Sequence, residues 1–350
     1  MIGRGIFKYL TLLLGLTILV LLAKILENKL ENNNFQVFDV SSSLTSHQHN
    51  RDQRSLDSGD YRKDSFITIA TKHRKDYNYV DMGDEDDESS DDSDIPTIFA
   101  ITPTYKRFTQ KAELTRVSQT FRHIVNFHWI VIEDSKEKTS LVRNFLANCG
   151  LKYTHLNIRT PKFMQRSRKQ PRWAKSRGLE QRNLGLSWLR KNVDPDVTRG
   201  VVYFADDDNT YDVRIFEEMR SISRVGVWPV AFTGAARWSG PICKHGHVIG
   251  FHNNWKPWRS FPLDMAGFAI NIRVLLVDFP SAKFEKTVRP GLMETSFLEQ
   301  ITTREKLEPK AEGCMKVYVW HTRTETPVIN INGERQLIKR GRPSNPEIET

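Results

Sequence analysis

The sequence predicts an α/β fold in which a mainly parallel sheet comes first and a smaller mixed region follows. Three short apolar runs, rich in β-branched and aromatic residues, have the composition of buried strands: IPTIFAITPTY (95–105), HWIVIED (128–134) and GVVYFADDD (200–208). Segments with helical spacing lie between them, at residues 111–124, 140–147 and 177–191. Strands that alternate with helices are joined by crossover connections, so these strands should run parallel.

Polar side chains follow the predicted strands. In sheets of this kind, ligands bind at the carboxyl ends of the strands. Those ends carry Thr104 and Tyr105, then Glu133 and Asp134, and finally the acidic triplet 206–208. We therefore expect these side chains to meet at one binding site.

The pattern changes after Asp212, which is a suitable cap for a helix over residues 213–223. Shorter strands are expected beyond it, at 227–232, 248–251 and 317–320, separated by tryptophan-rich loops. We therefore divide the folded part into two halves, residues 96–212 and residues 213–350.

Charge is unevenly distributed along the 350 residues, of which 52 are Lys or Arg and 42 are Asp or Glu. Residues 1–95 hold 11 basic and 17 acidic side chains, whereas residues 96–350 hold 41 basic and 25 acidic ones. The folded part therefore carries a net charge of +16. This charge favours an anionic ligand, such as a nucleotide sugar, a sulfated or uronate glycan, or a nucleic acid.

The amino-terminal region predicts a membrane anchor and a stem. Residues 6–26 form an apolar run with charges only near its two ends, long enough to cross a bilayer. Leu21 and Ala23 do not give the small-x-small pattern of a cleaved signal peptide, so we expect a retained anchor with residues 1–5 in the cytosol. Residues 27–95 are polar and end in DEDDESSDDSD (84–94), which predicts a disordered acidic stem. The acidic run is read as a solvated spacer, with mimicry of an anionic ligand as the alternative.

Cysteine is sparse. Cys149, Cys243 and Cys314 are too few and too scattered for a disulfide framework or a zinc site. At most one internal bridge can form, and the sequence leaves its pairing open.

The acidic triplet Asp206, Asp207 and Asp208 is the strongest chemical signal. Three adjacent carboxylates at the end of a buried strand repel one another and lose hydration, unless a cation or hydrogen-bond donors compensate. A hard divalent ion such as Mg²⁺ or Mn²⁺ takes oxygen ligands of this kind and completes its shell with phosphate oxygens and water. The preceding segment RGLEQRN adds Arg177 and Arg182, which can neutralise a diphosphate if Arg177 lies at or before the first helical turn.

Seven motifs, in order along the chain, resemble the β1,3-glucuronyltransferase family. They are PTYKR (103–107), QKAEL (110–114), RGLEQRN (177–183), VVYFADDDNTY (201–211), FPLDMAGFA (261–269), LEPKA (307–311) and VWHTRTE (319–325). The resemblance runs from about residue 96 to the carboxyl terminus and includes the tail GRPSNPEIE.

The resemblance implies a glycosyltransferase of GT-A fold that is a single-pass type II protein of the Golgi membrane, with its catalytic domain in the lumen. It implies a homodimer that uses Mn²⁺ and UDP-glucuronate and inverts the anomeric centre. The acceptor would be a glycan that ends in galactose, on a proteoglycan linkage region, a glycoprotein or a glycolipid. Residues 96–212 would then bind the UDP-sugar and the metal, and residues 213–350 the acceptor.

The same motifs imply roles for donor-site residues. Asp208 resembles the metal ligand, with Asp207 near the ribose and Asp206 supporting the basic side chains around the donor. The remaining donor-site residues implied by the resemblance are Pro103, Thr104, Tyr105 and Asp134 around the uridine, Arg177 and Arg182 at the phosphates and glucuronate, and His321 with Arg323.

Inversion requires one displacement, in which a base removes the proton of the acceptor hydroxyl. Glu294, in GLMETSF, matches the family's catalytic base. Without the resemblance, it would be read as an acid that stabilises the amino end of a helix.

The loop HNNWKPWRSFPLD supplies the expected acceptor-binding residues Trp255, Arg259 and Asp264, because indole rings stack on galactose while charged groups bind its hydroxyls. The segment RWSGP departs from the family pattern. Ser239 stands where the family usually has an acidic residue that contacts the acceptor galactose. We expect Ser239 at the acceptor and a broader acceptor range.

Two other functions are considered. A catalytically silent glycan-binding relative is disfavoured because the acidic triplet and Glu294 are intact. A metal-dependent nucleic-acid enzyme would suit the net charge of +16, but the amino-terminal anchor argues against a nucleic acid as partner.

Overall fold

The computed structural model describes residues 95–167, 169–170, 174–325 and 331–344. The predicted cytosolic tail, membrane anchor and nearly all of the stem lie outside these residues. No helix within the described ranges is both long and apolar enough to cross a bilayer.

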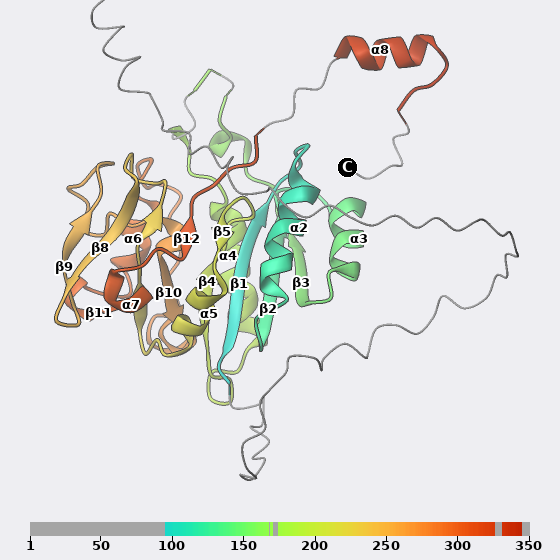
Figure 1. Cartoon of the computed structure of the whole chain (residues 1–350). Helices are drawn as coiled ribbons and strands as arrows, with labels where there is room; N and C mark the ends of the chain where they lie inside the picture. The colour runs from blue at the N-terminus through green and yellow to red at the C-terminus, as the bar shows by residue number, and fades with distance from the viewer. Residues whose placement is uncertain (1–94, 168, 171–173, 326–330, 345–350) are drawn as a thin grey trace, which may run out of the picture. The chain divides into compact units, whose positions relative to one another are not determined.

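A seven-stranded sheet forms the centre of the domain (Figure 1). β4, β1, β2 and β3 run parallel, while β10 is antiparallel to both of its neighbours, β4 and β6. β11 lies at the edge, parallel to β6. In spatial order the strands are β11 (Leu307–Pro309), β6 (Val225–Val227), β10 (Phe268–Asn271), β4 (Gly200–Phe204), β1 (Thr97–Thr104), β2 (Phe127–Glu133) and β3 (Lys152–Asn157).

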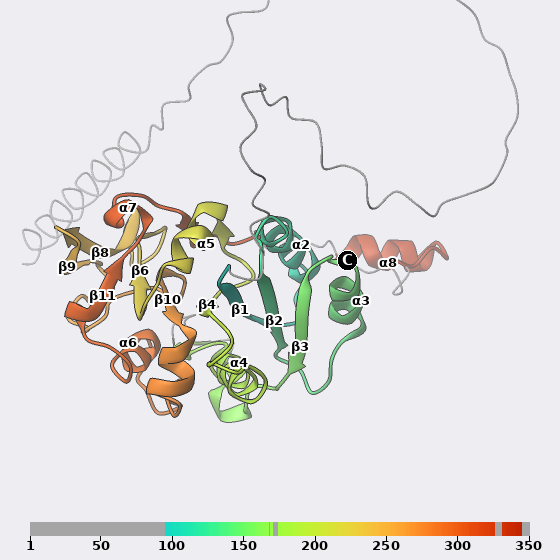
Figure 2. The ribbon, with the colours of Figure 1, turned by 90° about the horizontal axis from the view of Figure 1, so that it is seen from below.

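Helices cover both faces of this sheet (Figure 2). Along β1, Ile98 and Ala100 pack into one hydrophobic core, and Phe99 and Ile101 pack into the other. This alternation follows from the two-residue period of a strand. The first core contains residues of α2 (Gln110–Phe121), α3 (Ser140–Asn148) and α5 (Val213–Arg220), and the second contains residues of α4 (Leu179–Asn192) and α6 (Met293–Leu298).

A second, five-stranded sheet adjoins the first. Its spatial order is β5 (Thr210–Tyr211), β12 (Val319–Trp320), β7 (Val230–Ala231), β8 (Trp238–Lys244) and β9 (His247–His252). Residues from both sides of position 212 contribute to each sheet, so the two predicted halves are interleaved. The architecture confirms the predicted α/β fold, with a mainly parallel sheet and a smaller mixed one.

Short elements complete the described structure. Those not yet named are η2 (Lys162–Met164), η4 (Met265–Gly267), the π-helical η5 (Val274–Asp278), η6 (Arg304–Lys306), α7 (Ala311–Cys314) and α8 (Ile331–Lys339).

The expected helices are confirmed, with ends that shift by up to three residues. Asp212 caps α5 as predicted, because its carboxylate accepts a hydrogen bond from the Arg214 amide. The strand predicted over 227–232 is divided into β6 and β7. Pro229, which lies between these two strands, has no amide proton for a strand ladder. β3 was not predicted, because it is an edge strand whose side chains are exposed or half-buried and show no apolar run.

One disulfide joins Cys243 of β8 to Cys314 at the end of α7, across 71 positions of the sequence. Cys149 is free and buried. The bridge therefore connects the second sheet to the segment that leads from β11 to β12.

Replacing both bridged cysteines, by Cys243→Ser with Cys314→Ser, should lower the free energy of unfolding by about 2–4 kcal/mol, because the unfolded chain regains the freedom of a long loop. Urea unfolding in oxidising buffer measures the difference. A reductant should bring the wild type to the level of the variant and leave the variant unaffected. Equal stability of the two proteins in oxidising buffer would contradict the prediction.

Candidate active site

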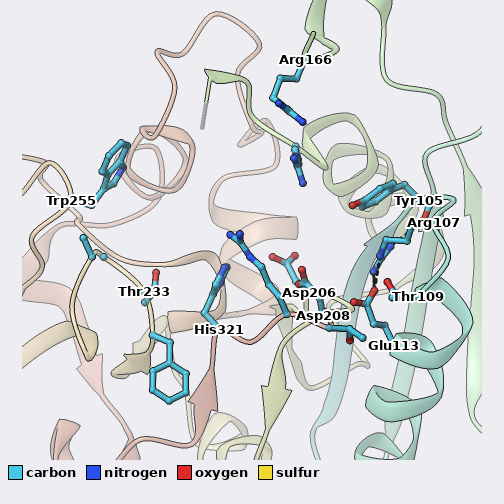
Figure 3. Close-up of a pocket in the computed structure, with 16 residues that line it drawn as sticks. Tyr105, Arg107, Thr109, Glu113, Arg166, Asp206, Asp208, Thr233, Trp255 and His321 are labelled. Carbon is cyan, nitrogen blue, oxygen red and sulfur yellow. Dashed lines mark hydrogen bonds and ion pairs between the residues drawn. The ribbon is translucent and has the colours of Figure 1, made fainter. Parts of the chain in front are cut away.

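Three adjoining cavities lie where β1, β2 and β4 end, and all three are lined by Arg177 and Asp206. The strand-end cavity, of about 580 Å³, is lined by Thr104, Tyr105 and the acidic triplet. The central cavity, of about 690 Å³, lies between Tyr105 and Trp255, with Asp206, Asp208 and His321 at its floor (Figure 3). The Glu294 cavity, of about 370 Å³, continues from it toward α6. Together they form one cleft.

The acidic triplet is neutralised unevenly. Asp206 pairs with Arg182, and Asp207 pairs with Arg107 at 2.7 Å. No donor or cation of the described residues pairs with the carboxylate of Asp208, which lines both the strand-end and the central cavity. Asp208 is therefore the member of the triplet that is open to a ligand.

Burial disfavours the charged form of the buried carboxylates in this triplet. It raises the pKa of Asp207 to about 6, although the charge and the hydrogen bond of Arg107 act in the opposite direction. Burial and the adjacent charge of Asp206 raise the pKa of Asp208, and His321 partly offsets this. A cation held at Asp208 would lower both electrostatic costs.

The strand-end cavity contains all the residues expected around the uridine. Tyr105 is 46% exposed, and the guanidinium of Arg107 lies 4.5 Å from the centre of its ring. Asp134 follows β2 and accepts hydrogen bonds from the amide and the hydroxyl of Thr160, both at 2.7 Å. Pro103 and Thr104 line the same wall. The cavity thus offers an aromatic face beside carboxylate and hydroxyl acceptors.

Arg177 and Arg182 both line the strand-end cavity, and the condition set by the sequence, that Arg177 lies at or before the first turn of the helix, is met. α4 begins at Leu179, so Arg177 precedes the first turn, and Nη1 of Arg182 donates to the Arg177 carbonyl at 2.9 Å. Gly178 between them has φ +69°, and a Cβ at that position would come within 2.5 Å of Arg182 Nη1. The left-handed backbone at this position therefore favours glycine.

Glu294 lies in the first turn of α6 and lines its cavity together with Trp255 and Arg259. Burial raises the pKa of Glu294, and the charge of Asp264 adds to this, while Arg259 and Arg182 act against it. A glutamate with a raised pKa is a stronger base, provided that it is deprotonated at the working pH.

The predicted acceptor residues Arg259 and Asp264 also make structural contacts. The Arg259 guanidinium donates to the carbonyls of Gly291 at 3.1 Å and of Trp255 at 3.2 Å, so it fixes the loop that carries Trp255. Burial lowers the pKa of Arg259. Asp264 accepts a 2.9 Å hydrogen bond from the hydroxyl of Thr233.

Ser239 is not at the cavity wall, so the expected direct contact with an acceptor is corrected. Its side chain is buried, with 1% exposed, in the β8 strand that pairs with β7. A Cβ on Gly234, which lines the central and the Glu294 cavities, would come within 2.8 Å of the Ser239 Cβ. Ser239 thus lies behind Gly234, and no residue of β8 lines any of the three cavities.

His321 and Arg323 line the central cavity, as expected from the motif WHTRTE. Nδ1 of His321 lies 3.7 Å from the carboxylate of Asp264. The backbone amide of His321 donates to the Ala231 carbonyl, which extends the pairing of β12 with β7 by one residue.

Sequence reasoning gave no role to several residues of the site. Arg107 lies between two carboxylates, those of Asp207 and Glu113, and its position in PTYKR was the available signal. Arg166 and Lys175 line the cleft from the loop before α4, where a run of basic residues was visible in the sequence. Arg116 and Thr322 bind the backbone at Asp208, a contact between distant segments for which the sequence carries no signal.

The chain is similar in sequence to a protein family and to several known proteins. The model of glycosyltransferase family 43 matches residues 117–325. Galactosylgalactosylxylosylprotein 3-beta-glucuronosyltransferase 3 from Homo sapiens is 47% identical over 264 residues, which cover 73% of this chain and 78% of the relative. Galactosylgalactosylxylosylprotein 3-beta-glucuronosyltransferase 2 from Mus musculus is 50% identical over 242 residues, or 69% of this chain and 72% of the relative. The family model, which matches more than half of the chain, and relatives of 47% and 50% identity show that the chain belongs to glycosyltransferase family 43.

Proposed function

We propose that this enzyme transfers glucuronate from UDP-glucuronate to the 3-hydroxyl of a terminal β-galactose, with inversion at the anomeric carbon. The acceptor would be the glycan of a proteoglycan linkage region, a glycoprotein or a glycolipid. The observation that carries the proposal is the single cleft with an open carboxylate, Asp208, on one side of Asp206 and a raised-pKa glutamate, Glu294, on the other. The similar proteins are galactosylgalactosylxylosylprotein 3-beta-glucuronosyltransferases, which supports the choice of glucuronate and galactose.

The donor would lie along the strand ends. The uracil would stack on Tyr105 and bind near Asp134, and the ribose would lie near Asp207. Arg177 and Arg182 supply cationic donors at the amino end of α4 for the diphosphate and the glucuronate carboxylate. His321 and Arg323 would complete the binding of the donor from the opposite wall.

A divalent cation, which we propose to be Mn²⁺, fits at Asp208. The other two carboxylates of the triplet are already paired with arginines. Within the described ranges, no three His, Cys, Asp or Glu side chains are grouped to hold a metal. Most of the ion's ligands would therefore be diphosphate oxygens and water. When bound, the ion supplies Lewis-acid stabilisation of the leaving diphosphate.

Glu294 would act as the base in one displacement. Its carboxylate takes the proton from the acceptor 3-hydroxyl while that oxygen forms the bond to C1 of glucuronate. The bond from C1 to the diphosphate oxygen breaks on the opposite side, and UDP leaves with the electron pair. The products are the glucuronylated acceptor and UDP, and no covalent enzyme intermediate is needed.

The acceptor would enter beside Trp255, whose indole lines both the central and the Glu294 cavities. Arg259 holds this loop through backbone carbonyls, so its contribution is to fix the position of the indole.

The compartment and the assembly are proposals that rest on the sequence and on the resemblance. An anchor at residues 6–26 would hold the enzyme in the Golgi membrane with the catalytic domain in the lumen. A homodimer is proposed on the same basis.

Incubation of the protein with UDP-glucuronate, Mn²⁺ and a panel of acceptors that end in galactose tests the proposal. We expect release of UDP together with a glucuronylated product, with the new β1,3 bond identified by NMR. A glucose-terminated acceptor is the control and should remain unmodified. Glycan binding without any transfer would favour a catalytically silent relative instead.

Asp208→Asn should weaken the binding of UDP in Mn²⁺ by roughly tenfold or more, because the amide loses the charge that links the cation to the protein. Binding of UDP without metal should change little. Calorimetric titration with and without Mn²⁺ measures both. Asp196→Asn, at an exposed position paired with Arg273, is the matched control and should behave as the wild type. An unchanged response to Mn²⁺ in the Asp208 variant would place the metal elsewhere.

Glu294→Gln should lower kcat by about 10²–10⁴-fold while the affinity for UDP stays near normal, because the amide cannot accept the proton. In the wild type, kcat should fall as the pH drops through the raised pKa of Glu294, so the acid limb should lie above the ordinary value of 4.5. Steady-state kinetics across pH tests both effects. Glu299→Gln, at the exposed end of the same helix, should leave both unchanged. Wild-type turnover in the Glu294 variant would assign the base to another group.

A further inference from the structure

Three segments that are far apart in the sequence meet at the backbone carbonyl of Asp208. Arg116 of α2 donates from Nη2 to this carbonyl at 2.7 Å, and Thr322, just after β12, donates its hydroxyl to the same oxygen at 2.8 Å. Nη1 of Arg116 also donates to the hydroxyl of Thr324 at 3.1 Å. We call these four residues, Arg116, Asp208, Thr322 and Thr324, the Asp208 clamp.

The clamp connects residues that have different tasks in the cleft. Asp208 bears the open carboxylate, while His321 and Arg323 line the central cavity beside Thr322 and Thr324. β12 itself is only two residues long, so its ladder holds little of the segment that follows. Beyond β12, the hydroxyls of Thr322 and Thr324 both form hydrogen bonds, and the hydroxyl of Thr322 also bonds that of Thr210 at 2.9 Å.

Arg116 is suited to this task by its shape and its charge. The guanidinium presents its donors in a rigid plane, so two of them can bind the carbonyl and the hydroxyl in a fixed relation. Among the described residues no carboxylate forms an ion pair with Arg116, and its Nε is buried without a hydrogen-bond partner. Arg116 therefore offers its charge to the carbonyl of Asp208 and the hydroxyl of Thr324, and hydrogen bonds from a charged donor are stronger than neutral ones.

We propose that Arg116 is a positioning residue that holds the Asp208 carboxylate and the His321–Arg323 segment in one fixed geometry for a metal-bound diphosphate. The proposal rests on the proposed function for the identity of the ligand, but the contacts themselves do not. A metal ligand has to be held within about 0.5 Å of its productive position, and a backbone carbonyl with two donors meets this demand better than a free loop. Arg116 does not line the three cavities, so it acts through other residues.

The test uses Arg116→Gln, which removes the fork and the charge, Arg116→Lys, which keeps the charge, and Thr322→Val, which removes one hydroxyl at nearly constant volume. The readout is the ratio of UDP affinities with and without Mn²⁺. We expect this ratio to fall roughly tenfold in Arg116→Gln and about threefold in Thr322→Val, on the scale of charged and neutral hydrogen bonds. Arg116→Lys should recover part of the loss. In the double variant Arg116→Gln with Thr322→Val, the fall in this ratio should be smaller than the product of the two single falls, because both groups bind one carbonyl.

Two exposed residues provide controls. Thr115→Val lies on the same helix, and its hydroxyl donates only to the Lys111 carbonyl. Arg143→Gln lies on α3, and its side chain donates to the Lys138 carbonyl. Both should keep the wild-type ratio, and all variants should be compared by melting temperature.

Hydrogen exchange followed by mass spectrometry tests the clamp without any ligand. Peptides that cover residues 205–211 and 319–325 should exchange faster together in Arg116→Gln and stay unchanged in Thr115→Val. If the wild type fails to bind UDP with Mn²⁺, the proposed function is wrong. The exchange result still shows whether Arg116 holds the two segments together. An unchanged affinity ratio in Arg116→Gln, or a loss of melting temperature with no change in the ratio, would overturn the proposal.

Discussion

The placement of three consecutive carboxylates at the end of a fully buried strand is the constraint on which this site depends. β4 is buried along its whole length, so Asp206, Asp207 and Asp208 leave the core side by side. Their repulsion and lost hydration have to be compensated locally. Arg182 and Arg107 compensate two of them, and the third, Asp208, pairs with no cation of the described residues. The positions of α4 and of the loop after β1 follow from this, because each has to deliver an arginine to the triplet.

The parallel sheet gives these groups their common location. β1, β2 and β4 run in one direction, so Thr104, Asp134 and the triplet meet at one edge although they are up to about a hundred positions apart. The second sheet adds the opposite wall. Because β12 pairs with both β5 and β7, the segment that contains His321 lies beside residues that follow the triplet and beside the turn that contains Gly234. The proposed donor and acceptor regions are therefore built from interleaved strands rather than from two separate domains.

Several polar residues of the cleft serve the structure first. Arg259 binds backbone carbonyls of two loops, and Asp264 caps η4 while it accepts from Thr233. Such residues hold Trp255 and the cavity wall in place, and a resemblance by motif does not separate this task from contact with a sugar. Asp264 also affects Glu294. Burial raises the pKa of Glu294, and the charge of Asp264 raises it further.

The sequence by itself determined the alternation of strands and helices, the acidic triplet at the end of β4, and the arginines before and within α4, because each of these depends on local periodicity or on adjacent residues. Glu294 was singled out by the resemblance to a family and not by its neighbours in the sequence. The sequence did not determine the edge strand β3, the antiparallel β10, the pairing of Cys243 with Cys314 or the burial of Ser239 behind Gly234. The Asp208 clamp belongs to the same group, since its donors are 92 and 114 positions away from the carbonyl they bind. Only the tertiary structure decided these features, because the free energy of a long-range contact depends on which surfaces the folded sheets bring together.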